Sequence, residues 1–177
     1  MMVCTKSPPL TQRSQMVEPG YVRDINMNRE EALEFLALHQ PMPEELDITQ
    51  ELINKYDEVR IYFTTHPDKD AIPLFLQSFG EGNGLGVYQL VEDFFDKCCF
   101  DDVVTNISAI LENPHTIKSV RLWCTLLTIS FPDRRLINGL NISIQSNDED
   151  THDMAQLGLE MIAKKCSEQQ RMSHDSV

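Results

Sequence analysis

Apolar residues return every three or four positions along most of the chain, which is the spacing of one face of an α-helix. Asn28 followed by Glu31 has the form of a helix-capping box and predicts a helix that ends before Pro41. A second apolar stripe predicts a helix that is capped by Asp47 or Thr49 and runs to about residue 65.

Beyond this point the pattern recurs three times. Each recurrence consists of a first helix that begins at an acidic residue, then a polar break, and then a second helix. The opening residues are Asp70, Asp101 and Asp133. Equivalent apolar positions lie 31 and then 33 residues apart, at Ile72, Val103 and Leu136. The second helices carry Val87, Leu90, Val91 and Phe94, then Val120, Trp123, Cys124 and Leu127, then Met154, Ala155, Leu157 and Ile162. Helix pairs at this period bury their apolar faces by stacking, so we expect an all-α fold, a short α-solenoid of antiparallel helix pairs.

Two segments inside the repeats also fit β-strands. Residues 126–131 and 140–144 are rich in β-branched side chains and alternate in polarity. We favour helices, because each segment occupies a position in the repeat where another repeat has a clear helix. The Asn138–Gly139 pair lies between the two segments, but it interrupts the first helix of the third repeat, and we do not interpret it as a hairpin turn.

The ends of the chain lack this periodicity. Residues 1–26 hold Ser, Thr, Pro and Gly without an apolar pattern, and residues 167–177 are polar. We therefore expect a flexible N-terminal tail over 1–26, a repeat domain over 27–166 and a flexible C-terminal tail over 167–177. The N-terminal segment lacks the apolar core of a signal peptide, and no stretch approaches the ~20 apolar residues of a membrane span.

The chain has five cysteines, an odd number without a C-x-x-C pair: Cys4, Cys98, Cys99, Cys124 and Cys166. This spacing fits neither a disulfide framework nor a zinc site. We expect reduced thiols in a cytoplasmic protein, with Cys98, Cys99 and Cys124 packed on apolar helix faces.

The charge balance narrows the class of partner. Fifteen Lys and Arg stand against 28 Asp and Glu, which gives a formal net charge of −13. Such a surface repels phosphate backbones and anionic lipids, so we expect neither nucleic-acid nor membrane binding. It would either serve solubility alone or attract a basic protein.

No pattern of catalytic residues emerges. The glycine-rich stretch from Gly80 to Gly86 follows a predicted helix and contains Glu81 where a phosphate loop would recruit a basic residue, so we interpret it as a turn. The histidines are scattered, and no G-x-S-x-G is present. We expect no cofactor, no metal and no enzymatic activity. Trp123, on an apolar stripe, is expected in the core.

Residues 28–165 resemble the bacterial HEAT-like repeat proteins. The likeness is carried by the segments 70–80, 86–94 and 119–124, the last of which has a Val-Arg pair followed by the small residue Cys124. In the next repeat Ala155 holds the small position, but Thr151 and His152 stand where Val-Arg is expected, so the third repeat departs from the pattern.

Small acidic members of this group are similar to immunity proteins of bacterial toxin systems. The resemblance implies a stoichiometric inhibitor that covers a cognate toxin, and the charge suggests a basic toxin, for which a nuclease is one candidate. A HEAT-like adaptor with another cellular partner is the alternative. The expected partner contacts are acidic: Glu81, Glu92, Asp93, Asp96, Asp148, Glu149, Asp150 and Asp153.

Overall fold

A computed structural model describes residues 27–174 of the 177-residue chain, and the predicted tail over 1–26 lies outside this range. All secondary structure in the described part is helical, so the all-α prediction is confirmed. The α-helices are α1 (Arg29–Leu38), α2 (Gln50–Thr65), α3 (Ala71–Ser78), α4 (Glu92–Phe95), α5 (Phe100–Glu112), α6 (Lys118–Ser130), α7 (Ile137–Ile144) and α8 (Glu149–His174). Three short 3₁₀ helices join them: η1 (Gly84–Gly86), η2 (Tyr88–Val91) and η3 (Arg134–Leu136).

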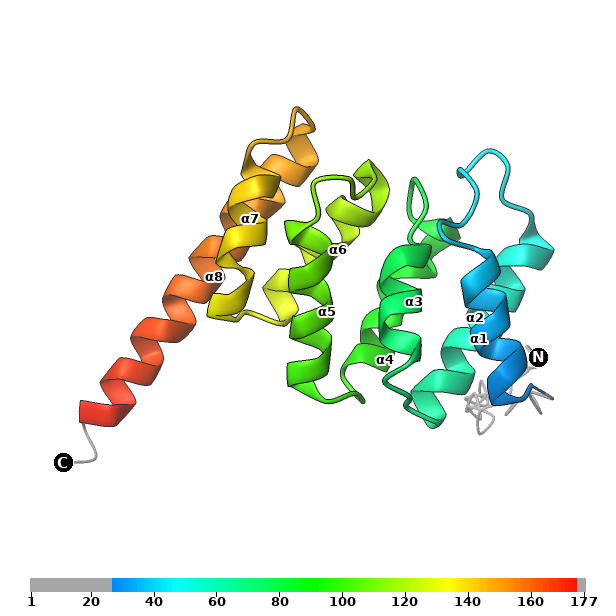
Figure 1. Ribbon diagram of the computed structural model, residues 1–177, viewed down its shortest axis with the longest axis horizontal. Coiled ribbons are helices and arrows are strands. Elements are labelled where there is room, and N and C mark those ends of the chain that lie inside the picture. Colours follow the sequence, from blue (N-terminus) through cyan, green and yellow to red (C-terminus); the bar gives the residue numbers. More distant parts are fainter. Residues whose placement is uncertain (1–26, 175–177) are drawn as a thin grey trace, which may run out of the picture.

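The helices pack in two rows. Helix α1 lies against α3, α3 against α5 and α5 against α7, while α2 lies against α4 and α6 against α8 (Figure 1). Most residues of the predicted apolar stripes are buried in the core, but Leu90 and Leu157 are 41% and 38% exposed. Interlocking aromatic rings fill the first half of the core: Tyr56, Phe63, Phe75, Phe79, Tyr88 and Phe94. Since each pair covers the apolar face of its neighbour, the core runs continuously from α1 to α8.

The predicted helix starts are confirmed for the first two helices. Asn28 and Glu31 form the capping box, with the Asn28 side chain accepting the Glu31 amide at 2.9 Å. Thr49, rather than Asp47, caps α2 by accepting the Leu52 amide at 3.2 Å.

Both segments with strand-like alternation are helical. Residues 126–130 belong to α6 and 140–144 to α7. The Asn138–Gly139 pair is not a hairpin turn, because Gly139 lies inside α7 where that helix packs against α5. A Cβ atom at Gly139 would stand 2.4 Å from Leu111 Cβ, so the glycine permits the close approach of the two helices.

Two predictions are wrong: the second helix of the first repeat is not continuous, and Cys99 is not packed on an apolar helix face. That helix is split into η2 and α4, which leaves Leu90 41% exposed while Val91 and Phe94 are buried. Cys124 is fully buried and Cys98 half-buried, but Cys99 is exposed, because it precedes α5 with an extended backbone and does not share the helical stripe.

The last helix is longer than the sequence predicted. Helix α8 continues past residue 166 to His174, since no glycine or proline follows Gly158 to end it. Its C-terminal part projects away from the other helices (Figure 1), and residues 167–172 are exposed. The predicted domain boundary therefore does not coincide with the end of a helix.

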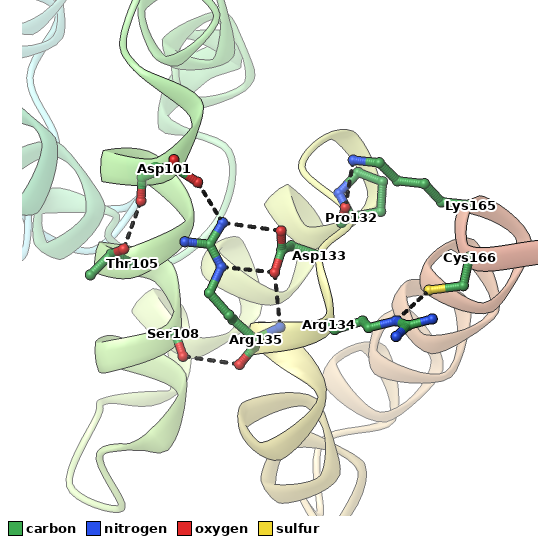
Figure 2. A network of polar contacts seen from close by, with 9 residues as sticks. All are labelled: Asp101, Thr105, Ser108, Pro132, Asp133, Arg134, Arg135, Lys165 and Cys166. Carbon is green, nitrogen blue, oxygen red and sulfur yellow. Dashed lines mark hydrogen bonds and ion pairs between the residues drawn. The ribbon is translucent and has the colours of Figure 1, made fainter. Parts of the chain in front are cut away.

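A polar network fixes the last helix pair to α5 (Figure 2). The Arg135 guanidinium donates to Asp133 and, at 2.8 Å, to Asp101, so the acidic residues near the starts of two equivalent helices share one arginine. The Ser108 hydroxyl donates to the Arg135 carbonyl at 3.1 Å. Lys165 of α8 donates to the Pro132 carbonyl at 2.9 Å. These contacts orient α7 and α8 on the helices before them.

Candidate protein-binding surface

The glycine-rich stretch forms a tight loop between α3 and η2. Gly82, Gly84 and Gly86 have φ angles of +71°, +56° and +88°, in the region where glycine alone is unstrained. The Asn83 side chain closes the loop by accepting the Gly86 amide at 3.0 Å. A Cβ atom at Gly84 would stand 2.5 Å from the Tyr88 ring, so this glycine also allows the loop to lie on the core. The turn interpretation agrees with this geometry.

Leu85 stands at the exposed end of this loop in a strained conformation. Its φ is +51°, the only positive value among the non-glycine residues of the described chain, and the residue is 49% exposed. A leucine in this region costs about 1–3 kcal/mol, and such strain is concentrated at functional sites. The loop therefore holds an apolar side chain toward solvent at a cost in stability.

Trp123 fastens the loop to α6. The indole stacks on Phe79 with ring centroids 5.2 Å apart and meets the edge of Tyr88 at 5.7 Å. Its Nε1–H donates to the Gly82 carbonyl at 3.2 Å. The expectation that Trp123 belongs to the core is only partly met, because the residue is half-buried and its outer side borders solvent.

A surface hollow of about 270 Å³ opens beside this tryptophan. Three chain segments form it: the glycine loop, the start of α6 and the start of α8. Its lining residues are Gly80, Glu81, Gly82, Lys118, Ser119, Leu122, Trp123, Asp148 and Asp150. Three of the acidic residues predicted to contact a partner, Glu81, Asp148 and Asp150, thus converge on one hollow.

Charge in the hollow is distributed around one lysine. The Lys118 ammonium lies 2.9 Å from Asp148 Oδ1, and Asp148 also accepts hydrogen bonds from the Thr151 amide at 3.2 Å and hydroxyl at 2.6 Å. These hydrogen bonds lower the pKa of Asp148. The bond from the Thr151 hydroxyl contributes most, and the bond from Lys118 contributes next. The Lys118 pKa is raised mainly by Asp148, with smaller contributions from Glu81 and Asp150. Three carboxylates against one ammonium leave the hollow with a net charge of −2.

The three carboxylates have different roles. Asp148 caps α8 and its side chain is only 16% exposed, so its charge is used inside the protein. Glu81 and Asp150 are exposed, and their carboxylates make no hydrogen bond or close ion pair with another described residue. They are the two groups of the hollow that are available to a partner.

The other predicted contact residues lie outside the hollow. Glu149 and Asp153 are exposed in the first turns of α8, Glu92 and Asp93 belong to α4, and Asp96 directly follows α4. Asp93 is 66% exposed and lies 3.9 Å from Arg60, which is held more closely by Asp57 at 2.7 Å. The predicted acidic set is therefore divided between two places. Sequence reasoning did not single out Lys118 or Leu85, since neither belongs to a motif.

Within residues 27–172, no three His, Cys, Asp or Glu side chains gather in a way that could hold a metal ion. No described helix combines the length and the apolar character needed to cross a membrane. His39 and His152 each form a hydrogen bond with one backbone carbonyl, at 2.7 Å in both cases. Comparisons of the chain with protein-family models, with curated proteins and with solved structures find no match.

Proposed function

We propose that this protein is a non-catalytic, cytoplasmic binding module with HEAT-like repeats, and that it acts as an immunity protein against a basic toxin. The observation that carries the proposal is the convergence of Glu81 and Asp150 beside Trp123, from segments far apart in the sequence. Aromatic side chains are enriched in protein interfaces, and carboxylates beside such a side chain complement the charge of a basic partner.

The helix arrangement supports the solenoid part of the proposal. Successive helix pairs α3–α4, α5–α6 and α7–α8 follow the period seen in the sequence and stack in order (Figure 1). In such repeats the connecting loops of successive pairs line up along one edge. The hollow is built in this way, from the connection after α3 and the starts of α6 and α8.

The charge supports a basic partner. At a net charge of −13 the chain attracts a basic protein over a distance of about a Debye length, roughly 8 Å at physiological salt. When this protein binds a nuclease, its carboxylates would occupy the positions of the substrate phosphates. The inhibitor would then associate quickly and block the active site of the nuclease. Glu92 and Asp93 on α4, with Asp96 just after it, would contribute to the encounter without entering the hollow.

A second groove favours the alternative, an adaptor with another cellular partner. Residues of the α1–α2 connection, α3, α5 and the α5–α6 connection line a groove of about 390 Å³. Twelve residues form it, and none is Asp, Glu, Lys or Arg, although 24% of the chain is charged. An uncharged groove suits a neutral extended segment of a partner.

Co-expression tests the immunity proposal. The protein is co-expressed with the product of the gene that adjoins its own, and the complex is purified at low and high salt. We expect a stable complex that weakens with salt and an adjoining product that is toxic only when expressed alone. An adjoining product that is harmless and does not co-purify would contradict the immunity proposal.

Variants then separate the two candidate functions for whichever partner is found. Glu81→Lys with Asp150→Lys should abolish binding of a basic toxin, while Gln77→Lys in the uncharged groove should leave it intact. The opposite pattern would identify the adaptor. Glu30→Lys with Glu34→Lys is the matched control, because it makes the same change of charge at two exposed positions of α1 that line neither the hollow nor the groove.

A further inference from the structure

We infer that the hollow beside Trp123 receives an arginine side chain of the partner. The inference rests on the proposed binding of a basic protein and names the chemical group that is recognised. The hollow measures about 270 Å³, which is below the range of about 300–1,000 Å³ usual for small-molecule and cofactor sites. Its size suits one long side chain.

The walls of the hollow match the two parts of an arginine side chain. Phe79 stacks on one face of the Trp123 indole and does not line the hollow, whereas the indole is half-buried and does line it. A guanidinium group is planar and weakly hydrated, and it stacks on an indole more favourably than an ammonium does. Leu122 adds an apolar surface for the methylene groups that carry the charge.

The free carboxylates lie where the guanidinium would end. Glu81 belongs to the glycine loop and Asp150 to the first turn of α8, so the two approach the hollow from different segments. A guanidinium has five N–H donors in a fixed fork and can bind two carboxylates at once, whereas an ammonium acts as a compact point charge.

The remaining polar groups of the hollow do not compete for this position. Lys118 is 68% exposed on its side chain, and its ammonium is held by Asp148. The Ser119 hydroxyl donates to the Phe79 carbonyl at 3.1 Å and is directed into the protein. The hollow therefore offers an incoming cation two free carboxylates and an aromatic wall, with its own cation already neutralised.

Trp123 is the only tryptophan in the chain, so its fluorescence reports directly on the hollow. The full-length protein is titrated with acetylated hexa-arginine amide and, separately, with hexa-lysine amide of equal charge at low ionic strength. We expect a saturable change in Trp123 emission with hexa-arginine and binding about tenfold weaker with hexa-lysine. Binding is measured in parallel by calorimetry, which does not depend on the tryptophan.

A pair of charge-matched variants tests the carboxylates. Glu81→Gln with Asp150→Asn should weaken hexa-arginine binding by about tenfold and remove the fluorescence change. Glu30→Gln with Glu34→Gln removes the same charge from α1 and should preserve the fluorescence change. All four positions are at least partly exposed, and thermal unfolding by circular dichroism verifies that both variants fold.

The outcomes separate this inference from the proposed function. Binding by calorimetry with unchanged Trp123 emission, or with no effect of the Glu81 and Asp150 substitutions, would overturn the arginine site but keep a basic partner. Equal binding and equal emission changes with both peptides would overturn the selectivity for arginine. Absence of any binding to either peptide would overturn the inference and the basic-partner proposal together.

Discussion

Lys118, the first residue of α6, and Asp148, the residue before α8, form an ion pair with Nζ and Oδ1 2.9 Å apart. Asp148 also accepts two hydrogen bonds from Thr151 and so caps α8. The most buried carboxylate of the hollow therefore joins two helices, and Asp150, two residues further on, is left free for a partner.

Because Asp148 has a structural role and Asp150 does not, substitutions at these two positions should affect stability differently. Asp148→Ala removes the cap and the ion pair and should lower the free energy of unfolding by about 1–2 kcal/mol. Asp150→Ala, on an exposed side chain, should change it by less than about 0.5 kcal/mol. Urea denaturation followed by circular dichroism measures both, and equal losses in the two variants would contradict the roles assigned here.

The lowered pKa of Asp148 predicts a dependence of stability on acid. The ordinary pKa of an aspartate is 3.8. A carboxyl whose pKa is lower in the folded state stabilises the fold fully at pH values above 3.8. This contribution is lost as the pH falls through the lower pKa of the folded state. The pKa values of Asp68 and Asp133 are lowered as well, chiefly by Arg29 and Arg135. We expect the melting temperature to fall below about pH 4.

The contribution of Asp148 to this fall can be separated. Asp148→Asn keeps a capping side chain but removes the titrating group, so its melting temperature should change less between pH 5 and 3 than that of the unmodified protein. An unaltered acid dependence in this variant, measured by calorimetry, would show that Asp148 has no lowered pKa.

The conformation of Leu85 predicts a substitution that raises stability. Glycine adopts the same φ of +51° without steric cost, so Leu85→Gly should raise the free energy of unfolding by about 1 kcal/mol. Leu90→Gly is the matched control, since Leu90 is similarly exposed but has an ordinary negative φ in η2, and it should lower stability. Loss of stability in Leu85→Gly would disprove the strain.

The approach of α7 to α5 predicts the reverse of the usual rule for glycine in helices. Replacing a helical glycine with alanine ordinarily gains about 0.5–1 kcal/mol. At Gly139 the new Cβ would meet Leu111 Cβ at 2.4 Å, so Gly139→Ala should cost about 1–3 kcal/mol. Asn138→Ala, at an exposed position of the same helix, is the control for propensity. A gain in stability at Gly139 would show that the helices can separate at little cost.

Much of the helical pattern was predictable because it depends on local sequence. The capping pair Asn28 and Glu31 follows from spacing and side-chain type, which also narrow the cap of α2 to Asp47 or Thr49. The helical state of residues 126–130 follows from their position in the repeat. The division of the first repeat's second helix at residues 88–95 did not follow, because the glycine loop and packing on Trp123 override the apolar spacing.

The site was less predictable than the fold. The sequence indicated Glu81, Asp148 and Asp150 by charge alone, and it gave no way to tell that Asp148 is held by Thr151 and Lys118 while the other two are free. Trp123 lies on an apolar stripe, and its spacing alone does not show that its indole bonds the glycine loop and stays half-buried beside the hollow. Both distinctions depend on contacts between segments that are distant in the sequence.

Amide chemical-shift mapping tests the central claim most directly, because it shows which part of this 20.3 kDa protein contacts a basic ligand. The ¹⁵N-labelled protein is titrated with hexa-arginine amide, and the shift of each backbone amide is followed. The account predicts the largest changes in residues 80–86, 118–123 and 148–153, around the hollow. Changes confined to α4 or to the uncharged groove, with these three segments unaffected, would contradict it.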